Sequence, residues 1–169
     1  MIKYNFFNNK KIIVTGGAGF IGGCLIRRIL RETNANIFNI DKLGYASDLS
    51  YLNSLENHID KNLKRRHSLI NIDLYDLEET KKAIETVKPD IIFHFAAESH
   101  VDRSIQNPDD FIKSNIIGTY NLLVASKDYY YSSSLDKKNN FILHHISTDE
   151  VFGSLQETGY FDEETAYDP

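Results

Sequence analysis

The chain has 169 residues, of which 41% are hydrophobic and 25% charged, a composition that suits one globular domain with its own core. Its 19 basic and 24 acidic residues give a net charge of −5, and without a basic block this balance argues against a nucleic acid polymer or an anionic membrane as a partner. The single cysteine, Cys24, cannot form an internal disulfide, and no apolar run is long enough for a signal peptide or a bilayer span, so we expect a cytoplasmic protein.

Short apolar runs alternate with longer helical patterns along the chain. Strands are predicted over residues 11–16, 36–41, 67–74, 90–98 and 140–147. Helices are predicted over residues 20–32, 75–88 and 108–128, because apolar residues recur there at helical spacing. We interpret residues 127–140 as a polar surface loop and residues 153–169 as a loop or connection. The alternation predicts an α/β fold, a doubly wound parallel sheet of the Rossmann type with right-handed crossovers.

The stretch TGGAGFIGG (15–23) follows the first predicted strand and opens the first predicted helix. Its glycines can be counted as Gly16, Gly19 and Gly22, or as G-x-G-x-x-G beginning at Gly17. Asp41 ends the second strand 19 residues after Gly22 (41 − 22), close to the spacing of about 20 in dinucleotide-binding folds. Glycines allow the backbone to approach a pyrophosphate, and an acid there accepts ribose hydroxyls and repels a 2′-phosphate. We therefore predict NAD rather than NADP; the alternative is a turn that only packs helix on strand.

Polar residues also follow the third, fourth and fifth predicted strands. Asp73 could reach the adenine edge, or it could cap the next helix. FAAESHVDRSI (95–105) begins with small residues that leave room for a flat ring, although a solvated loop with an Asp102–Arg103 charge pair is the alternative. The fifth strand ends in Ser147, Thr148, Asp149 and Glu150.

Two carboxyl groups in one cleft tend to separate their pKa values, which leaves an acid and a base suited to eliminating water. A helix-capping cluster is the other interpretation of residues 147–150. Because the carboxyl ends of parallel strands share one edge of the sheet, we expect the loops after the fourth and fifth strands to meet over the reactive ring of the dinucleotide.

The stretches TGGAGFIG, DKLGYASDL, AAESHVDRSI, FIKSNIIGT and ISTDEVFG resemble those of the dTDP-glucose 4,6-dehydratases, within the extended short-chain dehydrogenase/reductase superfamily. AAESHVDRSI and STDEVFG are the most specific of these. Nucleotide-sugar epimerases share the fold and the glycines but are expected to lack the Asp-Glu pair, which makes an epimerase the less favoured alternative. The resemblance implies conversion of dTDP-glucose to dTDP-4-keto-6-deoxyglucose by an NAD-dependent homodimer in deoxysugar biosynthesis, with no metal.

The resemblance also implies roles for residues at matching positions. Ser99 and Thr148 would contact the dTDP-sugar, Asp149 would protonate the C6 hydroxyl, and Glu150 would remove the C5 proton. Ser114 stands where the family usually has threonine. The residues implied around NAD are Gly16, Gly19, Phe20, Ile21, Gly22, Asp41, Lys42, Leu43, Gly44, Asp73, Leu74, Phe95, Ala96, Ala97, Glu98, Ser99 and Ser114.

The superfamily also uses a Tyr-x-x-x-Lys pair, and no tyrosine in these 169 residues has a lysine four positions later. The resemblance covers nearly all of this sequence but about half of a full enzyme of this type. We therefore predict an NAD-binding domain over residues 1–152, with residues 153–169 starting the connection towards the Tyr-x-x-x-Lys helix and a substrate domain. We expect no unaided turnover, an uncovered apolar face on the 108–128 helix and no stable dimer. A truncated, non-catalytic nucleotide-binding module is the alternative.

Overall fold

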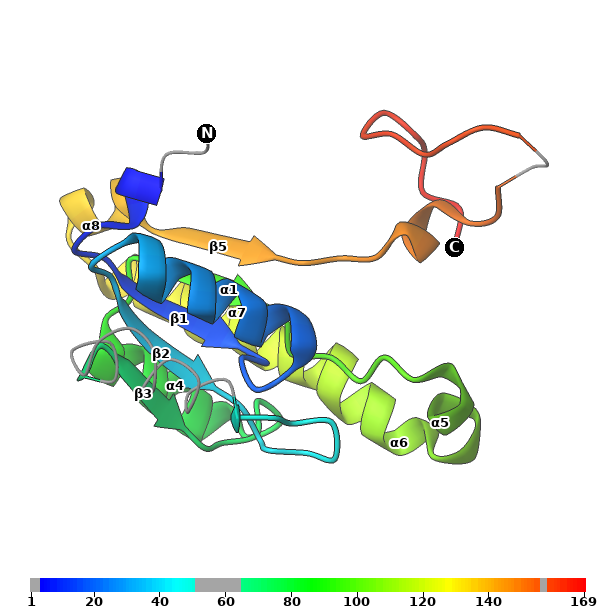
Figure 1. Cartoon of the computed structure of the whole chain (residues 1–169), viewed down its shortest axis with the longest axis horizontal. Coiled ribbons are helices and arrows are strands. Elements are labelled where there is room, and N and C mark those ends of the chain that lie inside the picture. Colours follow the sequence, from blue (N-terminus) through cyan, green and yellow to red (C-terminus); the bar gives the residue numbers. More distant parts are fainter. Residues whose placement is uncertain (1–3, 51–64, 156–157) are drawn as a thin grey trace.

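The computed structural model describes residues 4–50, 65–155 and 158–169, and these contain one parallel sheet of five strands (Figure 1). The strands are β1 (Lys11–Thr15), β2 (Asn36–Ile40), β3 (His67–Ile70), β4 (Ile91–His94) and β5 (Ile142–His145). Their order is β3-β2-β1-β4-β5, so β1 is central and the chain reverses direction across the sheet between β1 and β4. All pairs are parallel. The predicted fold class is confirmed.

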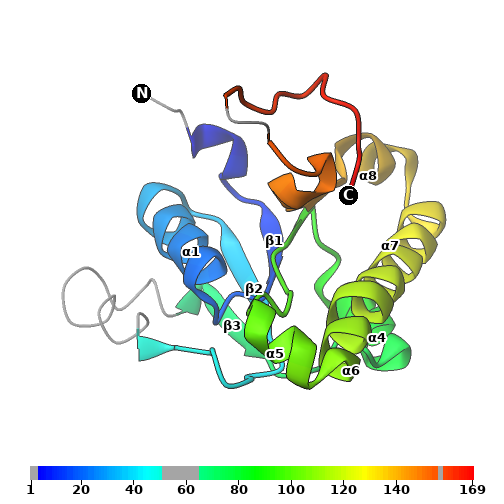
Figure 2. The ribbon, with the colours of Figure 1, turned by 90° about the vertical axis from the view of Figure 1, so that its right-hand side faces the viewer.

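Helices cover both faces of the sheet because successive residues of a strand point to opposite sides. On one face, Ile12 and Val14 pack with Ile26 and Ile29 of α1 (Phe20–Glu32). On the other face, Ile13 packs with residues of α4 (Leu77–Val87) and α7 (Thr119–Ser132). Figure 2 shows α1 on one side of the strands and α4 and α7 on the other. Two separate apolar clusters therefore hold the central strand between them.

The predicted 108–128 helix is a run of three helical segments. It begins as α6 (Pro108–Phe111), continues as a π-helical segment η2 (Ile112–Gly118) and ends as α7 at Ser132. A short helix α5 (Val101–Gln106) precedes it, where the sequence suggested only a polar cluster. A π-helical turn widens the helix and is frequent at functional sites. Here it carries Ser114 and Asn115, whose contacts are described below.

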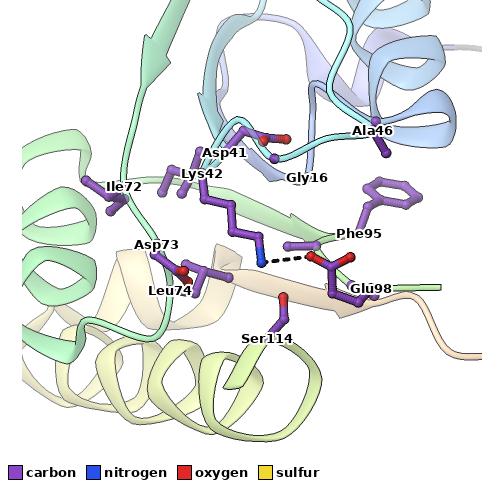
Figure 3. A pocket seen from close by; sticks show the side chains of 15 residues that line it. Gly16, Asp41, Lys42, Ala46, Ile72, Asp73, Leu74, Phe95, Glu98 and Ser114 are labelled. Carbon is purple, nitrogen blue, oxygen red and sulfur yellow. Dashed lines mark ion pairs between the residues drawn. The ribbon is translucent and has the colours of Figure 1, made fainter. Parts of the chain in front are cut away.

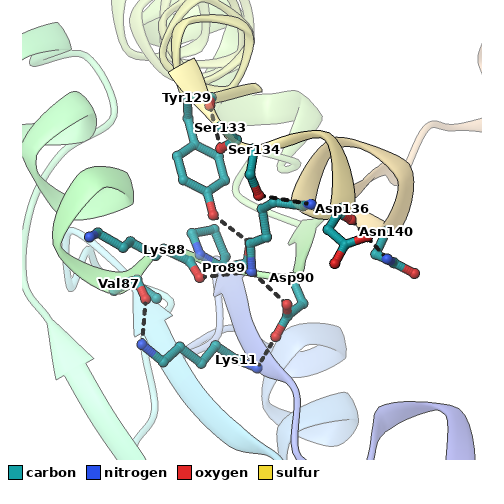
Figure 4. A network of polar contacts seen from close by, with 11 residues as sticks. Lys11, Val87, Lys88, Pro89, Asp90, Tyr129, Ser133, Ser134, Asp136 and Asn140 are labelled. Carbon is teal, nitrogen blue, oxygen red and sulfur yellow. Dashed lines mark hydrogen bonds and ion pairs between the residues drawn. The ribbon is translucent and has the colours of Figure 1, made fainter. Parts of the chain in front are cut away.

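The prediction of a surface loop over residues 127–140 is wrong. After α7, residues Leu135–Asn140 form the helix α8. Lys137 of α8 forms an ion pair with Asp90 at 2.5 Å and donates to the carbonyl of Lys88 at 3.2 Å, and the buried Tyr129 hydroxyl donates to the carbonyl of Pro89 (Figure 4). These partners lie about 40 to 50 residues earlier in the chain, so local polarity could not reveal them.

Two 3₁₀ helices stand near the ends of the chain, η1 (Tyr4–Phe7) and η3 (Asp149–Phe152). Beyond η3, residues 158–169 contain no helix or strand, as the sequence predicted. The tail folds back on η3, since Asp168 donates its amide to the carbonyl of Val151 and the Phe152 ring lies 5.3 Å from that of Phe161. Figure 1 shows this segment running out past the end of β5. Within the described residues, no helix combines the length and the apolarity that crossing a bilayer would require.

Candidate cofactor site

A pocket lies at the carboxyl ends of β1, β2 and β4, where doubly wound sheets bind their ligands. Figure 3 shows its side chains converging from the segments that follow these strands, from the segment after β3 and from η2. The residues that line it are Gly16, Gly19, Ile40, Asp41, Lys42, Gly44, Ala46, Ile72, Asp73, Leu74, Phe95, Ala96, Ala97, Glu98 and Ser114. Most were predicted from the sequence; Ile40, Ala46 and Ile72 were not.

The glycine turn brings two backbone segments together at the floor of this pocket. Gly16 has a φ of +69°, and a Cβ there would lie 2.6 Å from the amide nitrogen of Ala96, so only glycine fits without displacing the backbone. Gly22 packs against the carbonyl of Gly16. Gly17 instead faces Asn39 and Ile26, away from the pocket. Gly16 and Gly19 therefore line the pocket, and Gly22 supports the turn from behind.

The first turn of α1 leaves its backbone amides open. Gly19 is the N-cap residue, it provides no side-chain cap, and the turn contains no acidic residue. Uncapped amides at a helix N-terminus attract anions, since the helix dipole adds to their own polarity. Phe20 and Ile21 are 91% and 61% exposed and do not line the pocket, so their contact with a pyrophosphate stays a prediction.

Asp41 is buried and ties the end of β2 to the glycine turn. Its Oδ2 accepts from the amide of Ala18 at 2.9 Å, and its Oδ1 accepts from the amide of Leu43 at 2.8 Å and the hydroxyl of Ser47 at 3.2 Å. A carboxylate has about four acceptor sites, so three are in use and one is available to a ribose hydroxyl. Leu43 does not line the pocket, and its amide supports Asp41 instead.

An ion pair crosses the pocket from the segment after β2 to the segment after β4. Lys42 Nζ lies 2.8 Å from Glu98 Oε1 (Figure 3). Burial lowers the pKa of Lys42, but its hydrogen bond to Glu98 and the charge of that carboxylate outweigh burial and raise the pKa overall. Asn115 of η2 holds the backbone of Glu98 on both sides, accepting from its amide and donating to its carbonyl at 2.8 and 2.9 Å. Sequence reasoning missed Asn115, because an asparagine beside Ser114 gives no signal of its own.

Asp73 belongs to the pocket wall, and it also orders the chain that follows. Its Oδ1 accepts from the amide of Tyr75 at 2.9 Å, whereas the residue that caps α4 is Asp76, which accepts from the amide of Glu79. The interpretation of Asp73 as the cap of the next helix is therefore wrong, because Asp76 has that role. Asp73 lines the pocket beside Leu74, and its contact with an adenine stays a prediction.

A chain of buried hydrogen bonds lies directly beneath the pocket floor. Thr15 Oγ1 is 2.6 Å from His94 Nδ1 and 3.3 Å from the amide of Ala96, and His94 Nε2 is 2.9 Å from Thr119 Oγ1. One direction of donation satisfies all three contacts, from Ala96 to Thr15, from Thr15 to His94 and from His94 to Thr119. Burial and then the nearby charge of His145 lower the pKa of His94 to about 4, so the ring is neutral at physiological pH. His94 was not among the predicted site residues.

The acidic pair does not lie against this pocket. Thr148, Asp149 and Glu150 are exposed and are not among the lining residues, and the same is true of Ser99. Thr148 caps η3 by accepting from the amide of Glu150 at 3.4 Å, which is the helix-capping interpretation of this segment. The structure does not bring the two loops together over this pocket, and their meeting over the reactive ring of the dinucleotide stays a prediction. The hydrogen bonds and ring contacts of η3 run to the tail after it.

The strand order, the glycine turn after β1 and the acid at the end of β2 define a Rossmann-like domain of the short-chain dehydrogenase/reductase type. Comparison with protein families agrees and is more specific. The chain belongs to the family described as GDP-mannose 4,6 dehydratase, whose model matches residues 13–169.

Individual relatives point to the same class of dehydratase. The chain is 44% identical over 168 residues to the dTDP-glucose 4,6-dehydratase of Salmonella typhimurium, covering 94% of this chain and 45% of that protein. Among solved structures, the dTDP-glucose 4,6-dehydratase DesIV from Streptomyces venezuelae, with NAD and TYD bound, matches with a TM-score of 0.75 and 32% identity over 94% of this chain and 45% of DesIV. The UDP-Glc/GlcNAc 4-epimerase of Campylobacter jejuni matches with a TM-score of 0.73 at 28% identity, covering 95% of this chain and 43% of the epimerase. The chain thus spans less than half the length of these relatives, and its fold is common to dehydratases and epimerases.

Proposed function

We propose that the pocket binds NAD and that the chain is the cofactor-binding part of a dTDP-glucose 4,6-dehydratase. NAD binding is supported above all by the position of Asp41. Its carboxylate is buried beside the glycine turn and has one acceptor site left for a ribose hydroxyl. The uncapped amides of α1 suit a pyrophosphate, and a negative charge at the end of β2 disfavours a 2′-phosphate. The small residues Ala96 and Ala97 leave space for a flat ring beside Phe95.

The second half is supported by the similarity to curated dTDP-glucose 4,6-dehydratases and by the stretches AAESHVDRSI and STDEVFG. In the proposed reaction a dinucleotide held by the glycine turn and Asp41 would supply the hydride chemistry, from C4 of the sugar and back to C6. The C4 hydroxyl proton would go to the tyrosine of the superfamily's Tyr-x-x-x-Lys pair, which has no match in these 169 residues. Asp149 protonates the departing C6 hydroxyl and Glu150 removes the C5 proton, while Thr148 and Ser99 contact the substrate. An acid and a base on adjacent residues can serve both ends of the eliminated water when the sugar lies across them.

This mechanism requires η3 to approach the pocket, because its acidic residues are exposed in the structure. We propose that residues 1–152 form the cofactor domain and that residues 153–169 begin a connection to a substrate-binding part. By this proposal the 169-residue polypeptide binds NAD and does not turn over dTDP-glucose unaided. We expect the two activities to be separable, because the residues around the pocket are held by contacts with one another, whereas the contacts of η3 run to residues 158–169 and not to the pocket lining.

Titration calorimetry with NAD and NADP, together with an assay for the 4-keto sugar, tests both halves. We expect NAD to bind with a clear preference over NADP, Asp41→Asn to weaken NAD binding and reduce that preference, and no keto sugar to form. The matched control is Asp48→Asn, since the carboxylate of Asp48 accepts only from the amide and hydroxyl of Ser50 among the described residues and does not line the pocket. Failure of NAD to bind would contradict the first half, and keto-sugar formation by the isolated polypeptide would contradict the separation of the two activities.

A further inference from the structure

Two loops flank the candidate cofactor pocket, and a second set of contacts joins them outside the Lys42–Glu98 ion pair. One loop follows β2 and carries Tyr45; the other follows β4 and leads into α5, which carries Arg103. The hydroxyl of Tyr45 lies 2.8 Å from Nδ1 of His100. The guanidinium carbon of Arg103 lies 3.6 Å from the centre of the Tyr45 ring. We call Tyr45, His100 and Arg103 the latch.

The latch is anchored close to the pocket on both sides. Tyr45 stands between Gly44 and Ala46, which both line the pocket, and His100 follows two residues after Glu98, which also lines it. The Tyr45 and His100 rings meet edge to face with their centres 5.5 Å apart. The tyrosine ring is therefore held by an imidazole, a hydrogen bond and a cation at once, although it is half exposed.

The contacts of the latch lie beside the space that a ligand in the pocket would occupy. Gly16 and Ala96 approach each other below, and the ion pair between Lys42 and Glu98 spans the space between the loops. A dinucleotide that extends from the end of β2 to the end of β4 lies between the same two loops that the latch joins. The contacts of Tyr45 with His100 and Arg103 therefore add to the Lys42–Glu98 ion pair in holding the two loops together.

We propose that the latch retains the bound dinucleotide by slowing its dissociation. This inference rests on the proposed NAD binding and adds to it a kinetic role for three residues. Retention suits a reaction that regenerates its cofactor in each cycle, because a cofactor that need not exchange gains nothing by leaving. The contacts of the latch are outside the pocket lining, so they act on the loops and not directly on the ligand.

The experiment measures the dissociation rate of NADH from the 169-residue protein by stopped-flow fluorescence, with excess NAD as the chase. Tyr45→Phe removes the hydrogen bond but keeps the ring, and we expect it to raise the dissociation rate roughly two- to fivefold. Arg103→Met removes the cation from the ring and should raise it by roughly the same factor. Because the two contacts share one ring, the effects in the double variant should not simply multiply.

The matched control is Arg28→Met. Arg28 lies over the ring of Tyr4 at 5.2 Å, a cation–ring contact of the same kind on residues that do not line the pocket, so the dissociation rate should not change. Thermal unfolding of each variant shows whether the fold is kept, and Tyr45→Phe is mild enough to stay folded.

Unchanged dissociation in both latch variants, or a change confined to the association rate, would overturn the latch and leave the proposed function standing. A wild-type protein that binds no NADH would overturn both.

Discussion

His94 makes the stability of this domain depend on pH in a specific window. The ring is 2% exposed and sits between the hydroxyls of Thr15 and Thr119. Burial, followed by the charge of His145 on β5, lowers its pKa from 6.5 to about 4. Between these two values the unfolded chain binds a proton at this site and the folded chain does not. Acidification therefore favours the unfolded state from pH 6.5 down to about 4 and has no further effect through His94 below that.

The size of the effect follows from the same shift. A separation of about 2.5 pKa units at about 1.4 kcal/mol per unit gives about 3 kcal/mol of unfolding free energy lost across the window. The largest slope is about 1.4 kcal/mol per pH unit, which corresponds to one proton. His94→Gln removes the titration. At pH 7 this variant should be less stable by about 1–3 kcal/mol, because at least one buried hydroxyl then lacks its partner.

Urea unfolding of wild type and His94→Gln at intervals from pH 7 to pH 4 measures both quantities. The stability difference between the two proteins should change by about 3 kcal/mol as the pH falls, so that near pH 4 the variant is as stable as the wild type or more stable. Other titrating groups, including the half-buried His67, cancel in this difference. His144→Gln is the control, because His144 is exposed on the same edge strand as His145. If the difference in unfolding free energy between wild type and His94→Gln were the same at every pH, the conclusion that His94 is a buried, neutral imidazole would be refuted.

Three further predictions concern the pocket, the opposite end of the sheet and the outer helix. Gly16→Ala should abolish NAD binding in calorimetry, because its Cβ would meet the amide of Ala96 at 2.6 Å; retained affinity would contradict the close approach. Lys137→Met should lower the unfolding free energy by about 1 kcal/mol in urea titrations, because it removes the partly buried ion pair with Asp90; an unchanged value would mean that the pair contributes nothing. Ile116 is 59% exposed, so Ile116→Glu should leave the stability of the fold unchanged and should weaken the concentration-dependent association measured by sedimentation velocity. A lowered melting temperature would instead mean that Ile116 lies in a core.

The outer helix bears the uncovered apolar face that the sequence led us to expect. Ile112, Ile116, Tyr120 and Leu123 recur at intervals of three or four residues and are between 48% and 63% exposed. Such spacing places them on one side of a helix. An exposed apolar stripe of this kind marks an interaction surface, which gives the association measurement above its physical basis.

Much of the fold could be predicted because its signals are local. Apolar runs of four or five residues give the strands, and helical spacing with Pro89 just beyond the end gives α4. The cap of α4 was not predicted, because the sequence offered Asp73 and the structure uses Asp76. The helix α8 could not be predicted in this way, because Lys137 on α8 is held by Asp90 near β4. The π-helical segment η2 was not predicted either, since no residue type specifies the wider turn of a π-helix.

The pocket could be predicted where a residue type is fixed by the backbone or by charge. Gly16 follows from the tight approach to Ala96, and Asp41 follows from its place at the end of β2. His94 and Asn115 were missed because a buried histidine on a strand and an asparagine on a helix have many ordinary roles. Their importance depends on which atoms face them, and that is decided only when β1, β4 and η2 come together.

The contacts of each segment also explain why the acidic pair does not lie at the pocket in the structure. Each wall of the pocket is fixed by a bond within the chain, as Asp41 is to Ala18 and Glu98 is to Asn115, so its geometry needs no further partner. Asp149 and Glu150 follow β5, which pairs with β4 alone within the described residues, and two exposed carboxylates gain little by leaving water for a protein surface. Bringing them over the pocket therefore requires added contacts that outweigh this desolvation. Cofactor binding and elimination chemistry thus have different structural requirements, and a polypeptide that meets the first alone should bind NAD and leave the sugar unchanged.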